Sequence, residues 1–336
     1  MRHLRLLALL ALGLAALAAS VRAGEHAHGL LLVANKGAHT VSIIDPESGT
    51  QVAVVPETGV TAHELAASPD GRLAFVPIYG NSGVGRPGTD GREIDVIDLV
   101  AHKVISTIDF GHGVRPHNAV VGPADGLIYV TTELDKTVSI IDPRTLKIVG
   151  SIPTGQPESH MLAISHDGKR GYTSNVGPGT VSVLDMESRK TVATIHISPV
   201  AQRISISPDD RLVFTADQTK PQLAIIDTAS SSIKGWVPLP GRGYGTASSP
   251  DGKWLVVAVP DERKVAVVDV AQQKVVQAID VPASPQEILM RPDGQVAYAS
   301  CDSSHKVAAI RTSDWKVDKL IDTGAGADGL AWATAK

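Results

Sequence analysis

Three histidines recur at one position of a repeated sequence, and their type and spacing could do metal chemistry. His63, His117 and His160 each lie five residues before the serine, or its equivalent, of a Ser-Pro-Asp-Gly-type turn. Asp328 occupies the matching position near the C-terminus. Imidazole nitrogens and carboxylate oxygens are ligands of zinc and copper. The pattern therefore predicts a zinc or copper site made by these four residues.

Three further repeats carry other polar residues at the same position. These are Gln202, Tyr244 and Gln286. If the position lines a channel, the three side chains are candidate contacts for a ligand held there. The alternative is that the whole column, histidines included, only holds ordered water.

A second candidate metal site depends on how the N-terminus is processed. Arg2 and Arg5 precede an apolar run over 6–19, and 21–23 offers small residues for cleavage after Ala23. This is typical of a signal peptide over 1–23, with a retained anchor as the alternative. No second apolar stretch is long enough to cross a bilayer. We therefore expect a periplasmic or secreted protein without a membrane span after cleavage.

Cleavage there would leave a short mature segment over 24–28. It contains His26 and His28. A free amine with histidine in third place can surround copper(II) or nickel(II) with nitrogens in a square plane. The segment is therefore a possible N-terminal metal site.

A repeat is needed to bring such distant residues together. Short β-branched runs, most of them ending in aspartate, recur from 41–45 to 307–311, mostly at about 42 residues. Turn signals divide each repeat into four short strands, as in 158–165, 170–175, 180–185 and 191–197. Four strands leave no room for a crossover helix. The sequence predicts an all-β, seven-bladed β-propeller with four-stranded antiparallel blades. The histidine position opens the innermost strand, so it should lie at the mouth of the central channel.

The two ends of the repeat region predict how the ring of blades closes. The first repeat begins at Gly29 without an innermost strand, and 327–335 supplies a spare one. We expect one domain over 29–336 and a monomer. The expected blades cover about 29–59 plus 327–335, 60–113, 114–155, 156–198, 199–241, 242–283 and 284–326.

Blade two has excess length in a glycine-rich stretch over 79–92. It joins the second and third strands, so it should emerge beside the histidines and either cover the channel, bind a partner or form a flexible loop. Glu64, Arg203 and Glu287 follow the channel position by one residue. Strand alternation predicts that they point into contacts between blades, as structural ion pairs or as substrate contacts.

Composition excludes some classes of partner. The formal net charge is −4 and basic residues are not concentrated, which argues against nucleic acid. Cys301 is the single cysteine, so no internal disulfide can form.

The segment Tyr129-Val-Thr-Thr132, with a looser copy over 171–175, resembles the YVTN-type family of bacterial secreted propellers. Some propellers of this kind are similar to periplasmic zinc chaperones. The resemblance implies a metal-binding protein whose partner is a periplasmic metal-transport or envelope protein. Two alternatives remain: a non-catalytic interaction scaffold, and an enzyme of lactonase, lyase or haem-binding type. A non-covalent haem would need one of these histidines as its axial ligand.

Overall fold

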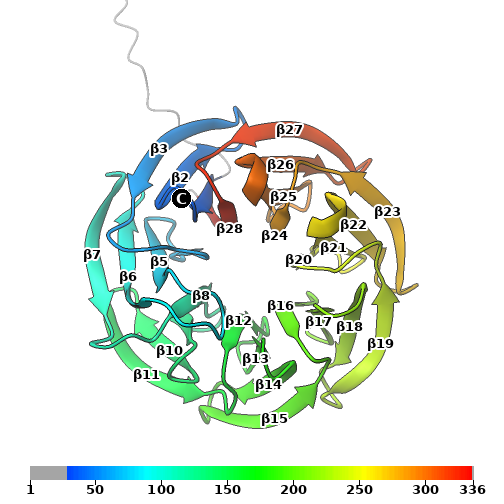
Figure 1. The fold of residues 1–336 in the computed structure, drawn as a ribbon, viewed down its shortest axis with the longest axis horizontal. Coiled ribbons are helices and arrows are strands. Elements are labelled where there is room, and N and C mark those ends of the chain that lie inside the picture. Colours follow the sequence, from blue (N-terminus) through cyan, green and yellow to red (C-terminus); the bar gives the residue numbers. More distant parts are fainter. Residues whose placement is uncertain (1–28, 335–336) are drawn as a thin grey trace, which may run out of the picture.

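Seven four-stranded antiparallel sheets surround a central axis in the computed structural model, which describes residues 29–334 (Figure 1). The sheets follow one another in chain order, so each repeat of the sequence is one blade. The prediction of a seven-bladed β-propeller is confirmed. In this part of the chain the helices are two short 3-10 turns, η1 (Pro260–Glu262) and η2 (Asp302–Ser304).

Each blade runs outward from an innermost strand at the channel to an outermost strand at the rim. From inside to outside, blade one has β28 (Ala327–Ala333), β1 (Leu30–Asn35), β2 (Thr40–Asp45) and β3 (Thr50–Pro56), and blade two has β4 (Ala66–Ala67), β5 (Leu73–Gly80), β6 (Asp90–Asp98) and β7 (Lys103–Asp109). Blade three has β8 (Pro116–Val121), β9 (Ile128–Thr132), β10 (Thr137–Asp142) and β11 (Lys147–Pro153), and blade four has β12 (Ser159–Ile164), β13 (Arg170–Asn175), β14 (Thr180–Asp185) and β15 (Lys190–His196). Blade five has β16 (Ala201–Ile206), β17 (Leu212–Asp217), β18 (Gln222–Asp227) and β19 (Ser232–Pro238). Blade six has β20 (Thr246–Ser248), β21 (Trp254–Val259), β22 (Lys264–Asp269) and β23 (Lys274–Asp280), and blade seven has β24 (Pro285–Met290), β25 (Val296–Cys301), β26 (Lys306–Arg311) and β27 (Lys316–Asp322).

The middle strands are buried on both faces, because each sheet packs between two others. The four central residues of β2 and of β10 are all buried, which explains their continuous β-branched runs. One hydrophobic cluster joins Leu32 of blade one to Ile97 of blade two, so the core lies largely between blades. The outermost strands alternate instead, with exposed residues at every second position of β3 and β7.

The last strand closes the ring. β28 pairs antiparallel with β1, with Leu30 opposite Ala333 and Val33 opposite Leu330. The first blade is therefore built from both ends of the propeller, as the spare strand predicted. No helix within residues 29–334 is long and apolar enough to span a membrane. The predicted signal peptide and the segment with His26 and His28 lie outside the described residues.

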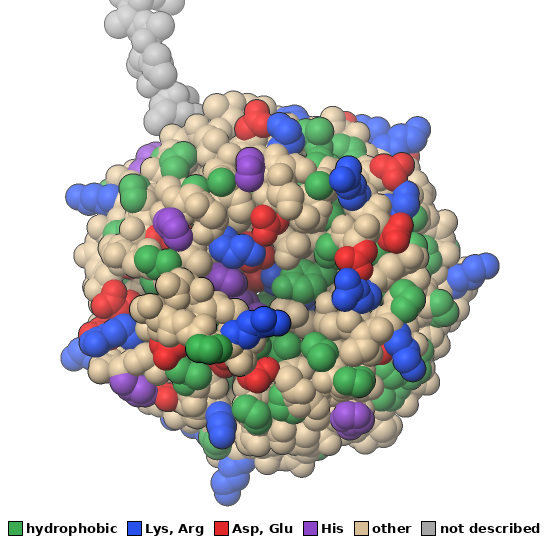
Figure 2. All heavy atoms as spheres, in the orientation of Figure 1, with side chains coloured by type: hydrophobic (Ala, Val, Ile, Leu, Met, Phe, Trp, Pro, Cys, Tyr) green, Lys and Arg blue, Asp and Glu red, His purple; other side chains and the backbone are tan. Residues whose placement is uncertain are grey.

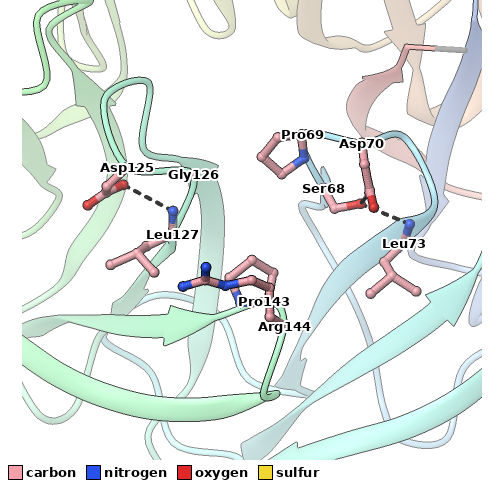
Figure 3. Close-up of a pocket in the computed structure, with 9 residues that line it drawn as sticks. All are labelled: Ser68, Pro69, Asp70, Leu73, Asp125, Gly126, Leu127, Pro143 and Arg144. Atoms are coloured by element: carbon pink, nitrogen blue, oxygen red, sulfur yellow. Dashed lines mark hydrogen bonds between the residues drawn. The ribbon is translucent and has the colours of Figure 1, made fainter. Parts of the chain in front are cut away.

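The Ser-Pro-Asp-Gly turns line shallow cavities between neighbouring blades, at the end of the innermost strand opposite the histidines. One cavity of about 390 Å³ lies between the turn of Ser68 and Asp70 and the turn of Asp125 (Figure 3). A similar cavity of about 220 Å³ lies between the turns of Ser249 and Asp293. Because these cavities recur with the turn, we attribute them to the repeat rather than to a dedicated site.

Candidate functional site

The three predicted histidines meet at the mouth of the central channel. His117 belongs to β8, His160 to β12, and His63 lies just before β4. The ring centroids of His63 and His117 are 5.3 Å apart, and those of His117 and His160 are 3.5 Å apart. The surface is hollowed at the centre of this face, with histidine and acidic side chains in the hollow and basic side chains around it (Figure 2).

Tyr79, from the end of β5, holds the histidines from the side. Its ring centroid lies 5.0 Å from that of His63, 5.3 Å from that of His117 and 6.1 Å from that of His160. The ring is fully buried, and its hydroxyl donates a hydrogen bond to the buried carboxylate of Glu133. Sequence reasoning missed this role of Tyr79, although the residue opens the extra length of blade two.

Burial keeps the three imidazoles neutral. It lowers the pKa of His63 to about 4, where the nearby charge of Asp328 opposes the shift and that of Lys36 supports it. The pKa values of His117 and His160 are also lowered well below the ordinary value, mainly by burial. The Nδ1 atoms of His117 and His160 are buried and have no hydrogen-bond partner. Neutral imidazole is the form that ligates metal ions.

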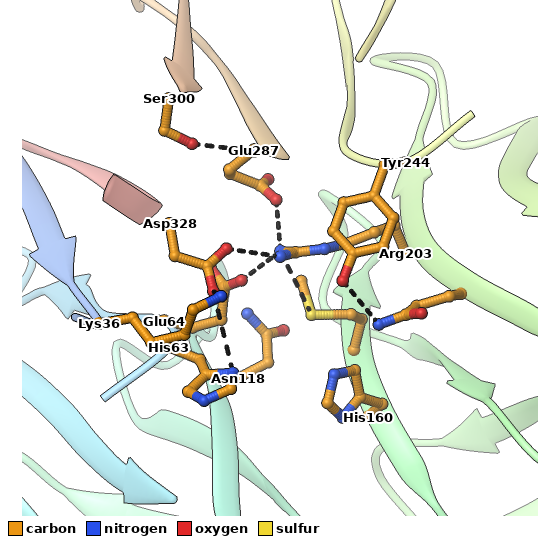
Figure 4. A network of polar contacts seen from close by, with 12 residues as sticks. Lys36, His63, Glu64, Asn118, His160, Arg203, Tyr244, Glu287, Ser300 and Asp328 are labelled. Atoms are coloured by element: carbon orange, nitrogen blue, oxygen red, sulfur yellow. Dashed lines mark hydrogen bonds and ion pairs between the residues drawn. The ribbon is translucent and has the colours of Figure 1, made fainter. Parts of the chain in front are cut away.

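A buried cluster of charged residues lies beside the histidines. Arg203 is 2% exposed at its side chain and reaches three carboxylates from three other blades. Its Nη1 donates to Glu64 and, at 2.5 Å, to Oε2 of Glu287, and its Nη2 donates to Oδ1 of Asp328 at 3.0 Å (Figure 4). We call Arg203 and these three carboxylates the channel hub.

Burial and the neighbouring charges shift the pKa values of the three hub carboxyls. Burial raises the pKa of Glu287 to about 7 and that of Glu64 well above its ordinary value, although Arg203 opposes both shifts. Burial also disfavours ionised Asp328, but Lys36 and Arg203 outweigh it and hold the pKa of that carboxyl below its usual range. Asp328 also accepts a hydrogen bond from Nζ of Lys36 at 3.2 Å.

The hub confirms the predicted ion pairs of Glu64, Arg203 and Glu287 between blades, but it places them at the channel and not between the faces of neighbouring sheets. The register of β16 shifts between Gln202 and Ile204, and Arg203 has a φ of 60°. The register of β24 shifts in the same way between Pro285 and Ile288. A bulge leaves two residues opposite one, so strict alternation fails there. Arg203 and Glu287 therefore reach the channel centre.

The three polar residues predicted to contact a ligand are placed differently from one another. Nε2 of Gln202 donates to the hydroxyl of Tyr244 at 2.9 Å, which joins blades five and six. The guanidinium of Arg203 lies 4.7 Å from the ring centroid of Tyr244. Gln286 turns toward its own backbone, with Nε2 3.4 Å from the carbonyl of Ser284. No bound ligand tests these contacts, which stay a prediction.

The glycine-rich insertion, residues 81–89 between β5 and β6, folds over blades three and four on the channel face (Figure 1). Arg115 fixes it from below: Nε donates to Asp90 at 2.6 Å and Nη2 to the carbonyl of Arg86 at 2.7 Å. Nη1 of Arg115 donates to Glu133 at 3.1 Å, and the amide of Gly85 donates to the same carboxylate. Glu133 therefore bonds the insertion and Tyr79 at once.

Known proteins share this sequence pattern and this ring of blades. The family described as "Cytochrome D1 heme domain" matches residues 26–165 and 158–333. The chain belongs to this family. A "seven-bladed beta-propeller protein" of Mycobacterium tuberculosis is 29% identical over 157 residues, which are 46% of this chain and 35% of that protein's length.

Solved structures of low identity share the fold. A chain of hydrazine synthase from Kuenenia stuttgartiensis superposes with a TM-score of 0.74 at 21% identity, over 86% of this chain and 94% of its own. The dihydro-heme d1 dehydrogenase NirN in complex with DHE gives 0.63 at 18% identity, over 90% and 65%. A protein of unknown function from Desulfotomaculum acetoxidans gives 0.76 at 14% identity, over 92% and 100%.

The prediction of zinc or copper is wrong. The family is named for a haem, not for either of these ions. The geometry agrees with this, because both carboxylate oxygens of Asp328 already accept hydrogen bonds, one from Arg203 and one from Lys36. In residues 29–334, no group of three or more His, Cys, Asp or Glu side chains is arranged to hold a metal ion. The comparisons confirm a propeller family, while the YVTN-type likeness and the zinc-chaperone analogy gain no support from them.

Proposed function

We propose that this protein binds haem at the mouth of its channel, with His63 as the iron ligand. The family match, which covers nearly all of the described ring, carries this proposal. A bound haem supplies a redox-active iron whose behaviour depends on its axial ligand and on the polarity of its surroundings. The residues at the mouth fit that group, for the two reasons that follow.

The first reason is the state of the histidines. All three imidazoles are kept neutral by burial, and His63 is the most exposed, with 19% of its side chain accessible. Its Nδ1 lies 3.8 Å from Oδ2 of Asp328, which is too long for a hydrogen bond. His63 is therefore able to offer a nitrogen to an iron at the mouth. His117 and His160, which are almost fully buried, support it from below.

The second reason is the charge beside His63. Lys36 has 31% of its side chain exposed, and its Nζ lies between Asp302, at 3.0 Å, and Asp328, at 3.2 Å. The acidic side groups of a haem would pair with this ammonium by taking the place of Asp302. The carboxylates of the hub converge on Arg203 instead of on an open position, which does not favour the divalent-cation site that a lactonase would need.

A haem titration followed by absorption spectroscopy tests the proposal. We expect the native protein to bind one haem and to show the shifted absorption bands of a histidine-ligated iron. His63→Ala should weaken binding by at least tenfold, which corresponds to about 1.4 kcal/mol. The matched control is His112→Ala, because His112 is 61% exposed and pairs with Asp135 on the surface.

The two parts of the proposal fail separately. A native protein that binds no haem would contradict the function itself. A His63→Ala variant that binds as well as the native protein would contradict the choice of ligand, and His117→Ala and His160→Ala would then show which imidazole replaces it.

The family and the predicted signal peptide over 1–23 together support a periplasmic location. Separation of periplasm from cytoplasm after expression of the full chain tests it, and we expect the mature protein in the periplasm without residues 1–23. A periplasmic or envelope protein as partner stays a prediction.

A further inference from the structure

The insertion of blade two roofs a further cavity, beside the channel mouth. This cavity of about 350 Å³ lies between residues 85–87 and blades three and four. Sites for small molecules have volumes of about 300–1,000 Å³. Its lining combines apolar and charged side chains: Arg86, Pro87, Leu134, Lys136, Pro157 and Glu158.

The deeper wall of the cavity is electrically balanced. Its charged lining residues are Arg115 and Glu133, which are 5% and 3% exposed and bond each other. Arg115 also pairs, at 2.6 Å, with Asp90, which does not line the cavity. Glu133 also accepts hydrogen bonds from Tyr79 and from the amide of Gly85. Neither charge of this wall is left over for a ligand.

The outer wall keeps a positive surplus. The guanidinium of Arg86 and the ammonium of Lys136 belong to this wall, and neither forms an ion pair with any residue of the described range 29–334. Glu158 is the one remaining carboxylate of the lining, and its Oε2 accepts a hydrogen bond from the amide of Gly177 at 2.7 Å. Among the lining side chains alone, two cations without an ion pair stand against one carboxylate, a surplus of one positive charge at the outer wall.

We propose that this cavity binds a small organic monoanion: a carboxylate with an apolar body. The carboxylate would pair with Lys136 and Arg86, and the apolar body would lie against Pro87, Leu134 and Pro157. A dianion is disfavoured because its second charge would face Glu158. A cation is disfavoured by the surplus of positive charge.

The cavity borders on the channel site without belonging to it. Glu133 stands between them, because it lines the cavity and also bonds the hydroxyl of Tyr79, whose ring packs on the three histidines. A molecule bound in the cavity would therefore lie against Glu133, the carboxylate that accepts the hydrogen bond of Tyr79. The proposal itself does not depend on haem, so the protein can be tested without it.

Benzoate is a suitable probe, with benzamide as its neutral counterpart, phthalate as a dianion and benzylamine as a cation. Binding would be measured by calorimetry, and its place by the NMR shift of the Gly85 amide. We expect benzoate to bind at least tenfold more tightly than the other three. Higher salt should weaken benzoate binding, because both cations are exposed.

Two variants test which cations pair with the carboxylate of benzoate. Lys136→Ala and Arg86→Ala should each weaken benzoate binding several-fold, and together at least tenfold. Lys147→Ala removes an exposed lysine from the same blade and should leave binding unchanged. All three positions are on the surface, and melting curves would verify that the variants fold. Equal affinity for benzoate and benzamide, no benzoate binding, or unchanged binding by the double variant would each overturn the proposal.

Discussion

Among single residues, Glu57 lowers the stability of the folded protein when its buried carboxyl is ionised. Its Oε2 accepts a hydrogen bond from the amide of Ala62 at 2.9 Å, while its buried Oε1 has no partner. Burial, followed by the nearby charge of Asp95, raises the pKa of this carboxyl to about 7. Native Glu57 therefore binds more protons than the unfolded chain between about pH 4.5 and 7. The free energy of unfolding should fall as pH rises through this range.

Glu57→Gln should remove that loss, because an amide keeps the acceptor for Ala62 and carries no charge. We expect the variant to be more stable than the native protein by about 1–3 kcal/mol at pH 8, with the difference shrinking toward pH 5. Urea unfolding at both pH values measures it. Glu187→Gln, at an exposed position, is the control and should be neutral at each pH. A Glu57→Gln variant that is less stable at pH 8 would contradict the expectation.

Of the structural elements, the insertion of blade two depends most on one buried ion pair. Arg115 has 6% of its side chain exposed, and Glu133 has 2%. A Cβ at Gly85 would lie 2.5 Å from Oε1 of Glu158, and this glycine has a φ of +65°, so its backbone is fitted closely to blade four. The insertion is thus an ordered part of the ring.

Arg115→Met should release the insertion. Removing one partner of a buried pair costs about 3–5 kcal/mol, because the other charge is left without compensation. Hydrogen exchange should speed up at Gly85 and at the neighbouring amides of the insertion. Arg92→Met is the matched control, since Arg92 and Asp109 form an exposed pair with 48% and 43% of their side chains accessible. This control should cost less than about 1 kcal/mol. Equal effects of the two changes would contradict the assigned role of Arg115.

The regularity of the strands also explains which residues of the site could be predicted from the sequence. The column of His63, His117 and His160 was visible in the sequence because each histidine lies five residues before the turn that ends its innermost strand. Arg203 was assigned to the wrong side, because a bulge in β16 is not marked by glycine or proline. Tyr79 and Glu133 were missed for another reason. Their contact joins blades two and three through residues 54 positions apart, and no periodic pattern reports such a pair.

For the molecule as a whole, the fold was predictable because a blade is a local unit and the repeat of strands and turns defines it. Closure of the ring is the non-local step, since β28 packs Ala331 into the core cluster between blades one and two and Leu330 into the cluster between blades one and seven. Truncation before Ala327 would remove these contacts and leave β1 with an open edge.

We therefore expect the truncated chain to lose its cooperative thermal transition and to be cut rapidly by proteases. A peptide covering 325–334, added in excess, should restore part of the folded signal. A scrambled peptide of the same composition is the control. A truncated chain that melts like the native protein would show that the ring does not need this strand.

The channel hub affects how a ligand can enter and leave the central channel. Arg203, Glu64 and Asp328 have only 2–4% of their side chains accessible, although they lie at the axis of the ring. These buried side chains narrow the passage at the level of the hub, although Glu287 is 17% exposed. We therefore expect a ligand at the mouth to leave by the opening through which it entered. A second molecule has to wait until the first departs, and exchange at the site can be no faster than that departure.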